Sequence, residues 1–383
     1  MIKKTALIFF GLTLAITLLL FRPPFIKIPK LSTNDLYLDW LINGKDFFVP
    51  KGPFLVTNPE LLELDNHPEE SFTAQKQEGV YRIFCVGGST TRGWPFHHHL
   101  SYPKVLGLYL KDILPHKNTE VINAGFHAFN SVNDITLFQE LLEYEPDLVI
   151  VYEGINEEMF MPLYYGIRGR ILYFHTVFLR AFPLYRSLNA FRDNAFDHAF
   201  KARRFVLSGT QVNQENLKRH YIRNMHTMSS IAKNAGCKIV FLTQLTLPAG
   251  KGGNPTIEML NTNLKEFSSG NKRLLLDINE IYNNSNLGKD DPVMALANHP
   301  DYPGYMLMAR EICKFLYRND IISPREQWIW KKLGDDSSYF KKLDFNSIKL
   351  NDIYKECVSR MPGADKYRAK LERNVLFFKQ AYE

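Results

Sequence analysis

Four positions with chemically useful side chains or backbone groups follow one another along the sequence. Ser89 comes directly after an apolar run and two glycines, and Gly125 ends a second apolar run. Asn156 follows a third apolar run, and His299 stands much later, just before a helical segment. Ligands of open α/β sheets bind at the carboxyl ends of the strands, so these four positions can meet in space although they are far apart in sequence.

A serine and a histidine in such a place suggest nucleophilic catalysis. A serine hydroxyl is a poor nucleophile until a base takes its proton. An imidazole can take that proton and later return it to a leaving alcohol. The serine would also lie beside backbone N–H groups of a helix start, which stabilise a developing oxyanion. The Gly-Gly-Ser sequence alone is weak evidence for a nucleophile, because the needs of a turn explain it equally well. The succession of all four positions favours catalysis.

The sequence resembles the SGNH hydrolases, the GDSL-like esterase and lipase superfamily, over roughly residues 79–318. Four blocks carry the resemblance: Gly87-Gly88-Ser89-Thr90, Asn123-Ala124-Gly125, Gly154-Ile155-Asn156-Glu157, and His299 with Gly304-Tyr305. The third block is the most specific, since Gly-x-Asn-Asp/Glu after a buried strand is uncommon by chance.

The resemblance implies a role for each position. Ser89 would be the nucleophile and His299 its general base. The backbone N–H groups of Ser89 and Gly125, together with the side-chain amide of Asn156, would form the oxyanion hole. The resemblance implies no metal and no cofactor.

The sequence departs from the family at the residue that normally orients the histidine. The family has an acidic residue three positions before the histidine, where this chain has Leu296. Asp290 or Asp291 could reach His299 if the loop bulges, and we take Asp291 as the candidate acid. Alternatively, Asn298 or a backbone carbonyl orients the imidazole in a Ser-His dyad. A third interpretation is a degenerate site in a binding protein.

Alternating strands and helices predict a three-layer α/β/α sandwich of flavodoxin-like type with a five-stranded parallel sheet. The expected strands are 81–86, 119–123, 147–152, 238–243 and 273–277. The expected organisation is a membrane segment at 1–30, an irregular connector at 31–78, a hydrolase-like domain at 79–320 with an insert at 158–215, and a helical extension at 321–383.

The N-terminus resembles an export signal. Two lysines precede an uncharged run over residues 6–21, and no small-x-small cleavage site follows. We expect an uncleaved membrane anchor with the bulk of the chain outside the cytoplasm, and a cleaved signal peptide is the alternative. The insert at 158–215 is aromatic and basic, which suits a substrate wall for a glycan, a membrane-surface helix pair or ordinary packing.

Composition limits the other classes of function. The 383 residues are 45% hydrophobic with a net charge of +7 and a pI near 9.0, and no nucleic-acid motif is present. The spacing of the four cysteines matches neither a disulfide framework nor a metal site. The adjacent histidines 97–99 cannot easily face one ion, and a role in the substrate cleft is the alternative.

The sequence therefore predicts a membrane-anchored serine esterase that hydrolyses an acyl ester, with an acetyl ester of a cell-surface or secreted glycan as the preferred substrate. An O-acyltransferase acting on a surface polysaccharide is the first alternative. A non-catalytic carbohydrate-binding or assembly protein is the second. A lipase is less favoured, and the sequence does not define the oligomeric state.

Overall fold

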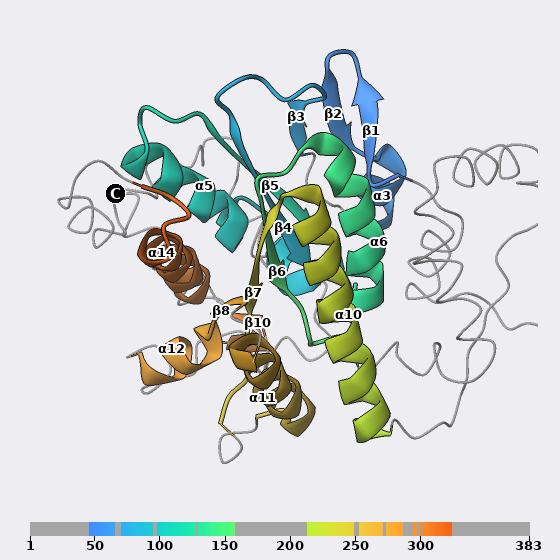
Figure 1. Cartoon of the computed structure of the whole chain (residues 1–383), viewed down its shortest axis with the longest axis vertical. Coiled ribbons are helices and arrows are strands. Elements are labelled where there is room, and N and C mark those ends of the chain that lie inside the picture. Colours follow the sequence, from blue (N-terminus) through green and yellow to red (C-terminus); the bar gives the residue numbers. More distant parts are fainter. Residues whose placement is uncertain are drawn as a thin grey trace, which may run out of the picture.

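Five parallel strands form the central sheet of the computed structural model, in the order β5–β4–β6–β7–β8 (Figure 1). The strands are β4 (Tyr81–Gly87), β5 (Thr119–Gly125), β6 (Leu148–Tyr152), β7 (Lys238–Leu242) and β8 (Leu274–Leu276). The structure describes residues 46–65, 70–94, 98–127, 129–157, 213–248, 253–270, 273–285, 294–296, 299–300 and 302–323. The predicted strands and the flavodoxin-like order are confirmed.

The strand register aligns the carboxyl ends of the first three strands of this sheet. Gly87 of β4 is paired with Gly125 of β5 on one side and with Tyr152 of β6 on the other. The segments that follow these strands therefore begin at the same edge of the sheet. This alignment brings the segments that carry Ser89 and Asn156 to one place.

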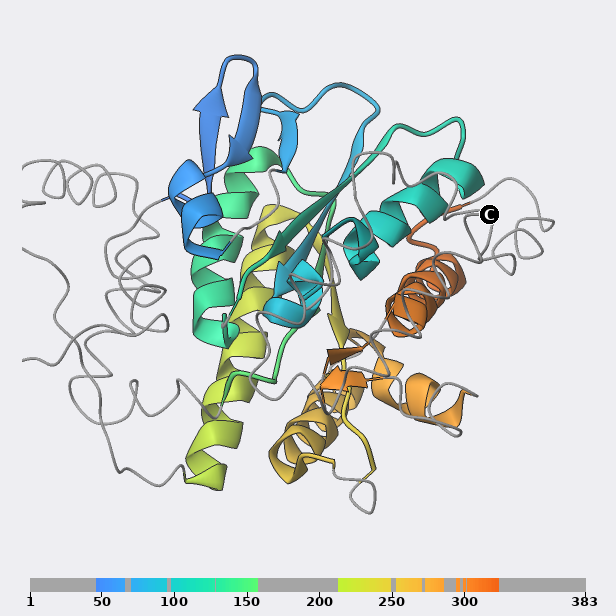
Figure 2. The same ribbon diagram turned by 180° about the vertical axis from the view of Figure 1, so that it is seen from behind.

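Two helical layers cover the sheet because both of its faces are apolar (Figures 1 and 2). Alternate strand residues point to opposite faces, so that Ile83 and Cys85 belong to one core, and Phe84 and Val86 to the other. The first core packs against α5 (Tyr102–Ile113), α12 (Ile278–Asn284) and α14 (Tyr302–Arg318). The second packs against α6 (Ser131–Leu141), α10 (Gln214–Ala235) and α11 (Pro255–Gly270). The three-layer sandwich is thus confirmed.

The shorter elements lie at the edges of this sandwich. Beside the sites described below are α4 (Ser89–Arg92), η1 (His98–Leu100), η2 (Leu142–Tyr144), β9 (Met294–Leu296) and β10 (His299–Pro300). The strands β9 and β10 form a separate antiparallel pair.

A small antiparallel sheet occupies part of the segment that we predicted to be an irregular connector. It consists of β1 (Phe48–Lys51), β2 (Phe54–Thr57) and β3 (Ser71–Thr73), with α3 (Pro59–Asp65) between the last two strands. The connector prediction was wrong here, because Phe48, Leu55 and Phe72 are buried in the second core.

Two charged side chains of the central domain hold this small sheet in place. The Glu140 carboxylate accepts the backbone N–H groups of Phe47 and Phe48 at 2.8 and 2.9 Å. Buried Arg82 donates to the carbonyl oxygen of Thr73 at 2.9 Å and pairs with Glu120 at 2.7 Å. These contacts span long stretches of sequence, so a local pattern does not reveal them.

Several predictions fall outside the described residues: the membrane segment 1–30, nearly all of the insert 158–215, and the extension beyond residue 323. Across the ranges that the structure describes, no helix is both long and apolar enough to span a membrane. The domain boundaries stay predictions.

Candidate active site

Ser89 begins the four-residue helix α4 at the carboxyl edge of the sheet. The turn before it requires glycine, because Gly87 has φ +148° and a Cβ atom there would overlap the carbonyl oxygen of Tyr152. Gly88 is the N-cap, and Gly93, at φ +106°, ends the helix. The hydroxyl-bearing residue is thus held in a tight turn between β4 and α4, with only 4% of its surface exposed.

The structure brings His299 to this serine across 210 residues of sequence. The Oγ atom of Ser89 and the Nε2 atom of His299 are 2.8 Å apart, within hydrogen-bonding distance. The ring of Trp94 packs edge-on against the imidazole with the centroids 4.8 Å apart. Tyr305, from the fourth sequence block, donates a hydrogen bond to the Trp94 carbonyl oxygen at 3.0 Å. Two of the predicted blocks thus build one Ser-His pair.

The imidazole of His299 is in the state that a general base needs. Burial, followed by the nearby His127, lowers the pKa of His299 from 6.5 to about 3. The ring is therefore neutral at pH 7. For Nε2 to accept the hydrogen bond of the serine hydroxyl, the single proton of the neutral imidazole must lie on Nδ1.

The position of the missing acid is occupied by strand backbone. Leu296 of β9 is paired with His299 of β10 in an antiparallel ladder. Within the described part of the chain, no carboxylate forms a hydrogen bond or ion pair with His299. Asp290, Asp291 and Asn298 lie outside the described residues. The role of Asp291 as the orienting acid stays a prediction.

Asn156 lies beside the nucleophile turn, as the third block predicts. Its Nδ2 atom is 2.7 Å from where a Cβ atom of Gly88 would stand. One of the two Nδ2 hydrogens is donated to the carbonyl oxygen of Phe129 at 2.7 Å, which fixes the amide. An amide nitrogen carries two donors, so a second N–H remains for an oxyanion next to Ser89.

Gly125 differs from the prediction. Its backbone N–H donates to the Asn123 side chain at 3.0 Å, so this donor is already engaged. A Cβ atom on Gly125 would lie 2.7 Å from the Thr91 side chain, which shows that α4 packs directly on this glycine. The Asn123 amide in turn donates to the Arg92 carbonyl at 3.3 Å. The geometry therefore supports Gly125 as a packing position rather than as an oxyanion donor.

Sequence reasoning missed two neighbours of the Ser-His pair. Trp94 touches His299 and also packs edge-on against His127, with the ring centroids 5.7 Å apart. The one signal for His127 was its place two residues beyond Gly125, at the carboxyl edge of the sheet. The histidine triplet that we considered for the cleft is only partly described, with His98 beginning η1.

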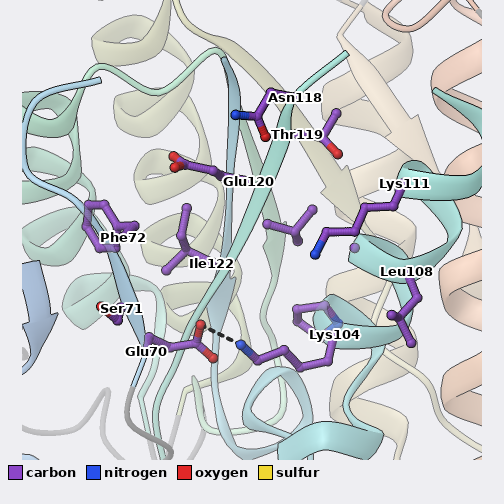
Figure 3. A pocket seen from close by; sticks show the side chains of 13 residues that line it. Glu70, Ser71, Phe72, Lys104, Leu108, Lys111, Asn118, Thr119, Glu120 and Ile122 are labelled. Atoms are coloured by element: carbon purple, nitrogen blue, oxygen red, sulfur yellow. Dashed lines mark hydrogen bonds and ion pairs between the residues drawn. The ribbon is translucent and has the colours of Figure 1, made fainter. Parts of the chain in front are cut away.

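Two other features of the described residues bear on where chemistry could occur. In these ranges of the chain, no group of three or more His, Cys, Asp or Glu side chains is arranged to hold a metal ion. A cavity of about 400 Å³ lies beside β5, and the ion pair between Lys104 and Glu70 (2.7 Å) closes one side of it (Figure 3). Ser89 and His299 are not among its lining residues.

Comparison with known proteins gives matches in structure only. No protein-family model matches the sequence, and no curated protein matches it significantly. The fold is similar to a protein assigned to the lipolytic G-D-S-L family from Desulfitobacterium hafniense DCB-2, with 16% identity, a TM-score of 0.41, and coverage of 61% of this chain and 99% of that one. A member of the lipolytic G-D-S-L family from Veillonella parvula DSM 2008 has 13% identity and a TM-score of 0.41, with 62% and 99% covered. An acetylxylan esterase from Geobacillus stearothermophilus has 14% identity and a TM-score of 0.40, with 62% and 94% covered.

Two of these solved structures carry the G-D-S-L family name. Such identities and TM-scores carry no argument about activity. We therefore base the function on the geometry around Ser89.

Proposed function

We propose that the protein is a serine esterase that hydrolyses an acyl ester through Ser89 and His299. The observation that carries the proposal is the 2.8 Å separation of Ser89 Oγ and His299 Nε2. A serine hydroxyl within hydrogen-bonding reach of a neutral, half-buried imidazole has the geometry of a nucleophile and its base. The carboxyl edge of a parallel sheet is also where such sites lie.

The proposed reaction has two halves. In the first, Ser89 Oγ attacks the ester carbonyl carbon while His299 Nε2 takes the serine proton. The carbonyl oxygen becomes an oxyanion, which the Asn156 amide and the Ser89 backbone N–H stabilise. The imidazolium then protonates the leaving alcohol, and the acyl group remains on Ser89. In the second half, His299 deprotonates a water molecule that attacks the acyl-enzyme, and the acid is released with free Ser89.

We further propose an acetyl ester of a cell-surface or secreted glycan as the substrate and an extracytoplasmic, membrane-anchored location. The uncharged run after Lys3 and Lys4 supports the location. The aromatic and basic composition of residues 158–215 supports a glycan with anionic groups. Both finer proposals rest on the sequence alone.

Hydrolysis of p-nitrophenyl acetate by the full-length protein tests the proposed reaction. We expect Ser89→Ala and His299→Ala to lose about 10³-fold or more in kcat. Ser268→Ala is the matched control, because Ser268 in α11 is equally buried at 3% exposure. Release of free acetate, rather than an acetylated sugar, separates hydrolysis from acyl transfer. Undiminished activity in Ser89→Ala would contradict the proposal.

A further inference from the structure

Three carboxyl side chains are buried directly behind the nucleophile turn. Asp134 belongs to α6, whereas Glu153 and Glu157 follow β6, and none of the three is more than 1% exposed. Within the described part of the chain, no lysine or arginine forms an ion pair with any of them. Three uncompensated negative charges in such a place would be very costly, so the cluster must hold protons.

The buried oxygens of this cluster lack donors. Both carboxyl oxygens of Asp134 and Oε2 of Glu153 are buried and receive no hydrogen bond from any N–H or O–H group of the described residues, and the same holds for Oε2 of Glu157. Burial, reinforced by the neighbouring carboxylates, raises the pKa of Asp134 and of Glu153 well above their ordinary values.

Glu157 has a different environment within the cluster. Its Oε1 atom accepts the backbone N–H of Ser131 at 2.6 Å, in the first turn of α6. A helix N-terminus favours a negative charge, so Glu157 acts as a cap for α6 and fixes the segment after Asn156 to that helix.

Glu153 connects the cluster to the nucleophile turn. Its Oε1 atom accepts the backbone N–H of Gly154 at 2.8 Å. Its Oε2 atom is 3.5 Å from where a Cβ atom of Gly88 would stand. One buried carboxyl group thus ties down the backbone of the turn that carries Asn156 and borders the residue before Ser89.

We propose that Glu153 is a positioning residue for the oxyanion donor Asn156. The proposal rests on the proposed function, because Asn156 is an oxyanion donor only in an acyl-transfer site. Its carboxyl group holds the Gly154 N–H, two residues before Asn156, and so fixes the turn from which the Asn156 amide reaches the Ser89 side of the sheet edge.

Kinetics of the full-length protein with Glu153→Gln and Glu153→Ala test the positioning. Glutamine keeps an acceptor for the Gly154 N–H, whereas alanine removes it. We therefore expect kcat of Glu153→Gln within about 3-fold of wild type. Glu153→Ala should lose about 10- to 100-fold in kcat, less than the loss of the donor itself, with KM nearly unchanged.

A double-variant comparison shows whether the effect runs through Asn156. If Glu153 acts by placing that amide, Glu153→Ala combined with Asn156→Ala should be no slower than Asn156→Ala alone. Losses that multiply would overturn the inference. It would also fail if Glu153→Gln were as slow as Glu153→Ala, because the acceptor for the Gly154 N–H would then have no role.

Amide hydrogen exchange tests the positioning without any substrate. The Gly154 and Asn156 amides should exchange faster in Glu153→Ala than in wild type or Glu153→Gln, while Val240 in β7 stays unchanged. If Glu153→Ala does not fold, Glu153→Leu removes the acceptors and keeps most of the volume. Unchanged exchange in the folded variant would overturn the inference. If wild type has no Ser89-dependent activity, the proposed function fails, and this exchange result still decides the positioning.

Discussion

Replacing Asn156 by alanine should impair catalysis far more than folding. The Asn156 amide is 7% exposed, donates one N–H to Phe129 at 2.7 Å, and lies beside Gly88. The change leaves the Phe129 carbonyl without this donor, which costs about 1–3 kcal/mol of folding free energy. It also removes a proposed oxyanion donor, which is worth about 10²–10³ in kcat, or roughly 2.7–4 kcal/mol in the transition state.

Asn263 offers a matched control for this experiment. It is also 7% exposed, and its Nδ2 atom also donates to a backbone carbonyl at 2.7 Å, but it lies in α11. Asn263→Ala should therefore cost about the same folding free energy as Asn156→Ala and leave kcat within about 2-fold of wild type.

The assay combines steady-state kinetics on p-nitrophenyl acetate with thermal or denaturant unfolding of wild type and both variants. The account predicts two similar losses of stability and one loss of kcat, in Asn156→Ala alone, with KM little changed. Equal kcat in the two variants would refute the reasoning, because Asn156 would then be only a structural link to Phe129.

The remaining predictions concern pH, backbone geometry and a buried cation. The pKa of His299 is lowered to about 3 and the base must be neutral, so the acid limb of the pH profile of kcat/KM should lie well below pH 6.5. An acid limb at or above pH 6.5 would contradict the assignment of His299 as the base. Gly87→Ala should destabilise the fold by more than about 4 kcal/mol in denaturant unfolding. Gly52 also has a positive φ, but a Cβ atom there would meet no other atom, so Gly52→Ala should cost about 1–2 kcal/mol. Equal costs would contradict the predicted overlap with β6. Arg82→Met should cost about 3 kcal/mol in the same measurement, and exposed Arg219→Met less than about 0.5 kcal/mol. A small loss at Arg82 would show that its four side-chain hydrogen bonds contribute little.

The central sheet was predictable because its strands are nearly continuous apolar runs, as expected for parallel strands buried on both faces. Residues 148–152 are all buried, and the run is too short for a buried helix. The meeting of Ser89 and His299 followed from the rule that functional residues gather at the carboxyl edge of such a sheet.

The small sheet β1–β3 was not predictable, because its stability comes from distant residues. Glu140 and Arg82 bind its backbone from α6 and β4, and a polar, turn-rich local pattern gives no sign of those partners. Only the burial of Phe48 and Phe72 against the second core distinguishes these strands from a connector.

The site was predicted in its sequence blocks but not in its details. Gly125 stands in the expected block, yet the Asn123 side chain turns back and takes its N–H. Glu153 and Asp134 belong to no motif in the sequence, and only the structure shows that they are buried. Such contacts depend on tertiary structure, which a local motif does not encode.

The most direct test of the central claim is covalent labelling of Ser89. The full-length protein would be treated with a fluorophosphonate, and the modified residue identified by mass spectrometry in wild type, Ser89→Ala, His299→Ala and Ser268→Ala. The account predicts one adduct on Ser89 in wild type and Ser268→Ala, none in Ser89→Ala, and greatly slowed labelling in His299→Ala. Folded wild-type protein that stays unlabelled, or labelling at full rate without His299, would contradict it.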